Sequence, residues 1–197
     1  MNRRSLGGVR VVLALGAAIV TGCASPPAHF YTLASTAAAD HAEPATFAVA
    51  VDGVSIPAAV DRPQFVIRRT ANEVSIDEFN RWAAPLGPAI ARVVAANLGA
   101  LLGTPRVVSG PLAAGFDPAY RIGIDVQRFD SLAGEGVAID AVWVVRKAAG
   151  QVVASGRSSL GEPAHGDGCA ALAAAHSRAI ARLSEQLAAA LRGAAGR

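Results

Sequence analysis

Asp61-Arg62-Pro63-Gln64 begins the most informative segment of this chain. The segment ends with Arg81-Trp82-Ala83-Ala84-Pro85-Leu86. Between these two runs, apolar and polar residues alternate on both sides of the polar segment Thr70-Ala71-Asn72-Glu73. Alternation around a polar turn predicts a β-hairpin. Proline is tolerated in the first turn of a helix, because its missing N–H has no helical partner there. The stretch therefore predicts a hairpin that leads into a helix starting at Pro85.

The predicted helix carries an apolar stripe at spacings of three and four residues, which is typical of one buried face. The stripe consists of Ile90, Val93, Val94, Asn97, Leu98, Leu101 and Leu102. Gly103 and Pro105 should end the helix, as a left-handed cap followed by a residue that cannot continue it. Asn97 is polar among apolar positions, and such a residue most often bonds the backbone of a neighbouring loop. A ligand contact is the alternative for Asn97.

The remaining sequence predicts further strands and one more helix. Within residues 137–146, around Trp143, both the odd-numbered and the even-numbered positions are largely apolar. This pattern predicts a central strand that is covered on both faces. An alanine-rich helix should run from residue 167 or 168 to Leu191. The other strands are expected at 30–33, 47–56 with a bend near Gly53, 106–109, 120–127 and 151–159. We therefore expect a single α+β domain, in which a mainly antiparallel sheet carries two amphipathic helices packed on one face.

The charge of the chain does not favour nucleic acid as a partner. The 197 residues carry a formal net charge of +3. Residues 1–22 include Arg3, Arg4 and Arg10 and no acidic residue, so the rest of the chain has a net charge of 3 − 3 = 0. The sequence also lacks the basic stripe with interleaved aromatic residues that is typical of nucleic-acid binding.

The amino terminus has the pattern of a bacterial lipoprotein signal peptide. Basic residues precede an apolar run from Val11 to Val20, which is shorter than the roughly 20 residues that span a bilayer. Val20-Thr21-Gly22-Cys23 follows and matches a lipobox. We predict a signal peptide at 1–22, a lipidated tether at 23–29 with acyl chains such as palmitate on Cys23, and a folded domain at 30–197. An ordinary secretory signal with an incidental cysteine is the alternative. Ala24 after the cysteine favours sorting to the outer membrane, by resemblance to bacterial lipoproteins.

The order and spacing of these segments resemble one known family. Asp-Arg-Pro-Gln, an asparagine in a turn, Arg-Trp-Ala-x-Pro-Leu and a helix with Asn-Leu near its end are similar to the PqiC-type ABC-transport auxiliary lipoproteins. Pro26-Pro27 and Phe30-Tyr31-Thr32-Leu33 near the mature start add to the resemblance. The resemblance implies an outer-membrane lipoprotein that works with a periplasmic MCE-domain protein and its ABC permease and ATPase in lipid transport.

Arg81, Trp82 and Leu86 are the candidate partner-contact residues, since arginine and tryptophan are enriched where interfaces carry their energy. Trp82 could instead pack in the core between the hairpin and the helix. The sequence offers no recognisable nucleophile motif or phosphate-binding loop, so we expect a binding protein without a cofactor and not an enzyme.

The run His165-Gly166-Asp167-Gly168-Cys169 spaces three possible metal ligands by two residues each, but no second cluster supplies a fourth. We therefore expect no metal site, and a buried, inert thiol at Cys169. Two other functions stay open. The domain could bind a lipid or another apolar ligand between sheet and helices, although the alanine-rich helix favours close packing there. It could also be an assembly lipoprotein of another outer-membrane machine.

Overall fold

The computed structural model describes residues 26–39 and 42–196. The predicted signal peptide and Cys23 lie outside the described residues. The elements follow in the order β1 (His29–Tyr31), β2 (Val49–Ser55), β3 (Gln64–Arg68), β4 (Val74–Trp82), α2 (Leu86–Leu102), β5 (Val107–Ser109), β6 (Tyr120–Leu132), β7 (Gly136–Lys147), β8 (Val152–Pro163) and α3 (Gly168–Ala195).

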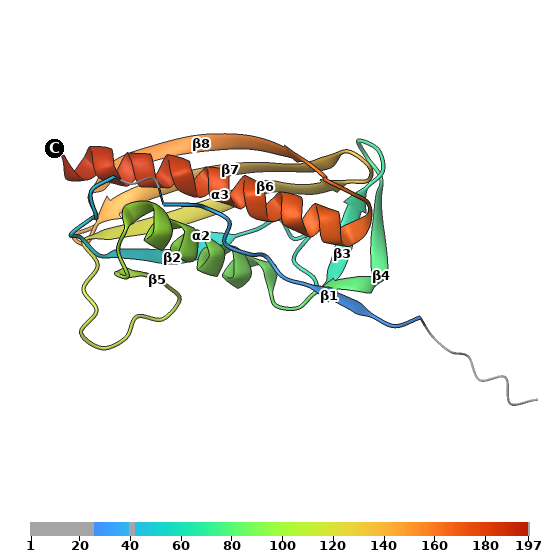
Figure 1. Cartoon of the computed structure of the whole chain (residues 1–197), viewed down its shortest axis with the longest axis horizontal. Helices are drawn as coiled ribbons and strands as arrows, with labels where there is room; N and C mark the ends of the chain where they lie inside the picture. Colours follow the sequence, from blue (N-terminus) through green and yellow to red (C-terminus); the bar gives the residue numbers. More distant parts are fainter. Residues whose placement is uncertain (1–25, 40–41, 197) are drawn as a thin grey trace, which may run out of the picture.

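The eight strands form one sheet that forks at β6 (Figure 1). Along one edge, β6 pairs antiparallel with β7, which in turn pairs antiparallel with β8. Along its other edge, the start of β6 pairs with β2, and its last two residues pair with β3. β5 lies beyond β2, and β4 and then β1 lie beyond β3. The two branches therefore occupy opposite ends of β6.

The α+β prediction is confirmed, with a sheet that is more mixed than expected. The longest ladders, β6–β7 and β7–β8, are antiparallel. The pairs β1–β4, β2–β5, β2–β6 and β3–β6 are parallel. A parallel pair needs a long crossover connection, and the chain between β2 and β6 contains the hairpin, α2 and β5. The predicted bend at Gly53 is confirmed, because the β2–β6 register shifts between Val51 and Gly53.

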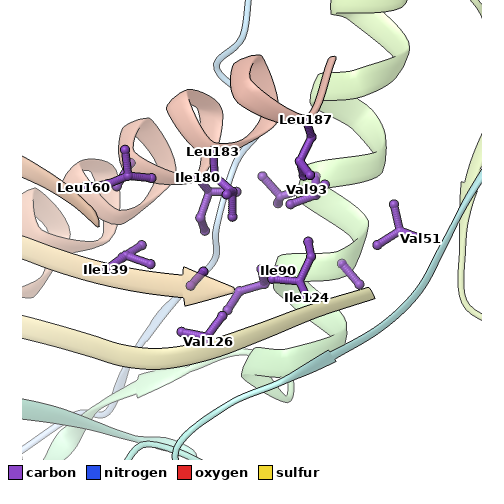
Figure 2. Close-up of a cluster of buried hydrophobic side chains, with 14 of the residues drawn as sticks. Val51, Ile90, Val93, Ile124, Val126, Ile139, Leu160, Ile180, Leu183 and Leu187 are labelled. Carbon is purple, nitrogen blue, oxygen red and sulfur yellow. The ribbon is translucent and has the colours of Figure 1, made fainter. Parts of the chain in front are cut away.

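Both helices cover one face of the sheet, as predicted. α2 contacts β2 and β5, α3 contacts β7 and β8, and the two helices pack on each other. Figure 2 shows the hydrophobic core between the helices and the sheet. Its labelled side chains come from the strands and from both helices: Val51, Ile90, Val93, Ile124, Val126, Ile139, Leu160, Ile180, Leu183 and Leu187.

The prediction that 137–146 is covered on both sides was wrong. Alternate residues of β7, from Val137 to Val145, are buried under the helices, but Val142 on the opposite face is 36% exposed. β7 is central because it pairs with strands on both edges, and its second face carries no helix. The last strand also extends beyond the predicted 151–159, because β8 continues through Gly161 to Pro163. Arg178 and Arg182 of α3 donate hydrogen bonds to the carbonyls of Pro163 and Gly161 and hold this end in place.

α2 ends where the sequence predicts and begins at Leu86, one residue after the predicted start at Pro85. Pro85 is the residue before its first turn, and Gly103 closes it with a φ of 62°. A left-handed φ of this kind favours glycine. None of the helices in the described part of the chain combines the length and apolarity needed to cross a membrane.

Residues 32–39, here called the N-terminal strap, run from β1 along the two helices (Figure 1). The fully buried Asn97 of α2 accepts hydrogen bonds at Oδ1 from the hydroxyl of Ser35 and from the N–H groups of Thr36 and Ala37. Ser177 of α3 accepts one from the N–H of Ala34. The prediction that Asn97 bonds a loop backbone is confirmed. The N-terminal strap is thus bonded to both helices.

Candidate functional site

The two halves of the opening sequence stretch meet around one small pocket. The N–H of Trp82 donates to the carbonyl of Pro63 at 2.6 Å, and Gln64 pairs with Arg81. The cavity beside this contact has a volume of about 300 Å³. It is lined by Asp61, Arg62, Pro63, Trp82, Ala83, Ala84, Pro85 and Leu86, and we call it the motif pocket.

The three candidate contact residues differ in exposure. The side chain of Arg81 is 38% exposed and lies 3.7 Å from a carboxylate oxygen of Glu78. Trp82 is only 7% exposed and Leu86 only 2%. A partner can therefore reach Arg81 directly, whereas it meets Trp82 and Leu86 only through the parts that line the motif pocket. Burial favours the core alternative for Trp82.

Trp82 belongs to an aromatic cluster that joins the hairpin to β6 and α3. Its ring stacks on Phe65, with centroids 4.3 Å apart and planes inclined by 25°. Phe129 and His176 meet it edge-on at 6.3 Å and 6.1 Å. Such ring pairs add about 0.5–1.5 kcal/mol beyond the area that they bury. The motif pocket is therefore backed by a rigid part of the core.

His176 and Ser131 form a buried pair that the sequence did not indicate. Nε2 of His176 lies 2.8 Å from the hydroxyl of Ser131, and its ring stacks on Phe129 at 3.8 Å. Burial lowers the pKa of His176 to about 3, although the nearby Asp130 acts in the opposite direction. His176 is fully buried and neutral, so it cannot exchange protons with a dissolved substrate. The two residues are 45 positions apart, and only the tertiary fold brings them together.

The three spaced ligand types near the start of α3 do not converge. Cys169 is buried, whereas His165 and Asp167 are exposed. Burial raises the pKa of the Cys169 thiol to about 11, which agrees with the predicted inert thiol. Within the residues described by the structure, no group of three histidine, cysteine or acidic side chains is placed to hold a metal ion.

A larger groove of about 750 Å³ lies between the N-terminal strap and α3, and we call it the α3 groove. Phe30 and Tyr31 line one side, and Ala170, Ala174 and Ala181 are among the residues on the helix side. Arg178, Arg182, Glu162 and Glu185 add charged groups to the lining. The sequence suggested ligand binding between the sheet and the helices. The groove instead lies along the side of α3 that faces the strap.

Two solved structures share this fold. One is the crystal structure of an uncharacterized protein, with a TM-score of 0.69 and 20% identity, covering 84% of this chain and 99% of that one. The other is the crystal structure of a Xanthomonas campestris protein assigned to the family model DUF330. It has a TM-score of 0.68 and 22% identity, covering 82% of this chain and 93% of that one. At these identities the similarity establishes the fold alone.

A sequence match identifies the family to which the chain belongs. No match was found among curated proteins. The family model described as "ABC-type transport auxiliary lipoprotein component" matches residues 31–188. The matched range includes the motif pocket, α2, all strands from β2 to β8, and α3 as far as residue 188. The chain therefore belongs to the PqiC-type family of ABC-type transport auxiliary lipoprotein components.

Proposed function

We propose that this chain is a non-catalytic lipoprotein of the Gram-negative outer membrane that serves an ABC transporter and its MCE-domain partner in lipid transport between the membranes. The observation that carries the proposal is the family match over residues 31–188. The test is affinity capture of the tagged chain from gently solubilised membranes, with proteins and lipids identified by mass spectrometry. Recovery of an MCE-domain protein with a permease and an ATPase is expected. Capture of a different outer-membrane machine would contradict the proposal and favour the assembly alternative.

The proposed anchor is Cys23, followed by a tether at 23–29 and the folded domain at 30–197. Two or three acyl chains hold a protein stably to a bilayer, because each buried CH₂ adds about 0.8 kcal/mol. The hydrogen bonds from the N-terminal strap to Asn97 and Ser177 support this arrangement, since they tie the tethered end to both helices. Cys23→Ser should leave unprocessed precursor in the inner membrane. Normal processing and outer-membrane recovery of that variant would rule out lipidation at Cys23.

The proposed docking surface combines the motif pocket with Arg81, which precedes the pocket residue Trp82 in β4. Arg81→Ala should weaken capture of the partner with little loss of stability, because this side chain is partly exposed and its ion pair with Glu78 is a surface pair. Arg92→Ala is the matched control, since Arg92 is exposed on α2. Equal capture by the two variants would show that Arg81 is not a contact residue.

The α3 groove favours binding of an apolar ligand as a second candidate function. Its volume of about 750 Å³ falls in the range of small-molecule sites, and Phe30, Tyr31 and several alanines line it. Mass spectrometry of the purified protein should then detect a bound lipid at a fixed ratio. A larger side chain in the lining, as in Ala174→Trp, should displace that lipid, whereas Ala189→Trp on an exposed position of the same helix should not.

A further inference from the structure

Exposed apolar side chains gather on two paired strands. Among the described residues, Val74, Ile76 and Phe79 of β4 are 45%, 43% and 42% exposed. Phe30 of β1 is 63% exposed. β1 pairs in parallel with β4 through Phe30 and Arg81, so these side chains belong to one edge of the sheet. We call the four residues the apolar edge. Large exposed apolar groups that share one edge indicate a contact surface.

The apolar edge lies at the end of the molecule nearest the tether. β1 begins at His29, and the chain leaves the fold at this end (Figure 1). Phe30 follows Cys23 by seven residues, and seven extended residues span at most about 25 Å. With acyl chains on Cys23 in a bilayer, Phe30 is held within that distance of the lipid. The contact surface nearest to the apolar edge is then the membrane itself.

We infer that the apolar edge rests on the lipid surface, with Phe30 and Phe79 at the level of the headgroups. The inference rests on the proposed acyl anchor at Cys23. Phenylalanine is among the apolar residues that proteins lying on a bilayer bury at the boundary between headgroups and acyl chains. The contact orients the domain, because it fixes one end of the sheet to the bilayer while the tether alone would let the domain turn freely.

The polar neighbours of the apolar edge keep the contact shallow. Asp77 accepts hydrogen bonds from the N–H groups of Phe79 and Asn80 and from the Asn80 side chain. Burial alone would raise the pKa of Asp77, but these hydrogen bonds outweigh it and lower the pKa, so the carboxylate stays charged at neutral pH. Glu78 is exposed beside it. Charged groups are costly in hydrocarbon, so β4 lies at the interface and does not insert into the bilayer core.

Depth-dependent fluorescence quenching tests the inference. The acylated chain carrying Phe79→Cys is labelled with a polarity-sensitive maleimide dye and reconstituted into vesicles of phosphatidylethanolamine and phosphatidylglycerol with a brominated fraction. Val152→Cys is the matched control, because Val152 is 51% exposed but pairs with Arg146 at the other end of the sheet. Cys169 is buried with a raised pKa and should take up no dye, which the unsubstituted chain verifies.

The dye at position 79 should lose most of its emission to brominated lipid, while the dye at position 152 should lose little. Equal, weak quenching at both positions in a chain that stays with the vesicles would overturn the lipid contact and leave the anchor intact. A dye at position 79 that is shielded from water but not quenched by brominated lipid would also overturn it, in favour of a protein contact. A chain that does not stay with the vesicles would overturn the anchor and the inference together.

Discussion

β4 contains two regions of opposite character. Val74, Ile76 and Phe79 are more than two-fifths exposed, whereas Trp82 at the end of the same strand is 7% exposed. Trp82 is covered because Phe65 stacks on it and the ring of His176 from α3 lies against it. Apolar character alone therefore does not make a core residue. Burial depends on which elements the fold places opposite, and the exposed part of the strand is free for contacts outside the chain.

The largest expected effect is at the buried end of this strand. Trp82→Ala should lower the free energy of unfolding by about 3–5 kcal/mol, because it removes a large side chain from the aromatic cluster. Denaturant unfolding followed by circular dichroism measures the loss. A loss below about 1 kcal/mol would contradict the core position of Trp82 and restore it as a contact residue.

Asn97→Ala should have the next largest effect, through the N-terminal strap. The substitution leaves the hydroxyl of Ser35 and the N–H groups of Thr36 and Ala37 without their acceptor, at a cost of about 1–3 kcal/mol. Hydrogen exchange at residues 34–37 should become faster by more than the loss of global stability explains, while exchange in β6 and β7 should change only in step with that loss. Unchanged protection of the strap would show that Asn97 does not hold it.

His176 should make stability depend on pH. Its pKa is near 3 in the folded chain, below the ordinary value of 6.5, so the unfolded chain binds more protons between these values. Stability is therefore full above pH 6.5 and falls as the pH is lowered toward 3, by at most about 1.4 kcal/mol per pH unit from this group. His176→Phe should flatten the pH dependence between pH 6.5 and 4.5. An unchanged slope in that variant would contradict burial of a neutral histidine.

The smallest effect on stability should occur at the exposed region of β4. Phe79→Ser should change the free energy of unfolding by about 0.5 kcal/mol or less, because the ring is 42% exposed. Thermal unfolding of the non-acylated chain in buffer measures this. A loss close to that of Trp82→Ala would remove the contrast between the two regions and make Phe79 a core residue.

Much of the fold follows from local sequence pattern. The spacing of Ile90, Val94 and Leu98 predicts α2, Gly103 predicts its end, and a polar position in the stripe predicts the loop contact of Asn97. These features depend on neighbours within a few turns of chain. The parallel pairing of β2 with β6 could not be predicted in this way, because more than sixty residues separate the two strands and no local pattern specifies which strands meet.

The candidate site was predictable in part for the same reason. The sequence stretch indicated that the segments around Pro63 and Trp82 belong together, and the structure joins them at the motif pocket. The sequence did not indicate that Arg81 is exposed while Trp82 and Leu86 are buried, because exposure depends on packing against distant elements. The pair of His176 with Ser131 and the apolar edge were missed, since each requires residues that only the tertiary fold brings to one place.

Site-specific photo-crosslinking in living cells can show whether the proposed docking surface contacts an MCE-domain protein. A photoreactive amino acid replaces Arg81, the neighbour of the pocket residue Trp82, in one strain and Arg92 on the exposed face of α2 in another. Crosslinked proteins are then identified by mass spectrometry. We expect adducts with an MCE-domain protein of an ABC transport system from position 81 and not from position 92. Adducts from position 81 only with another outer-membrane machine would contradict it.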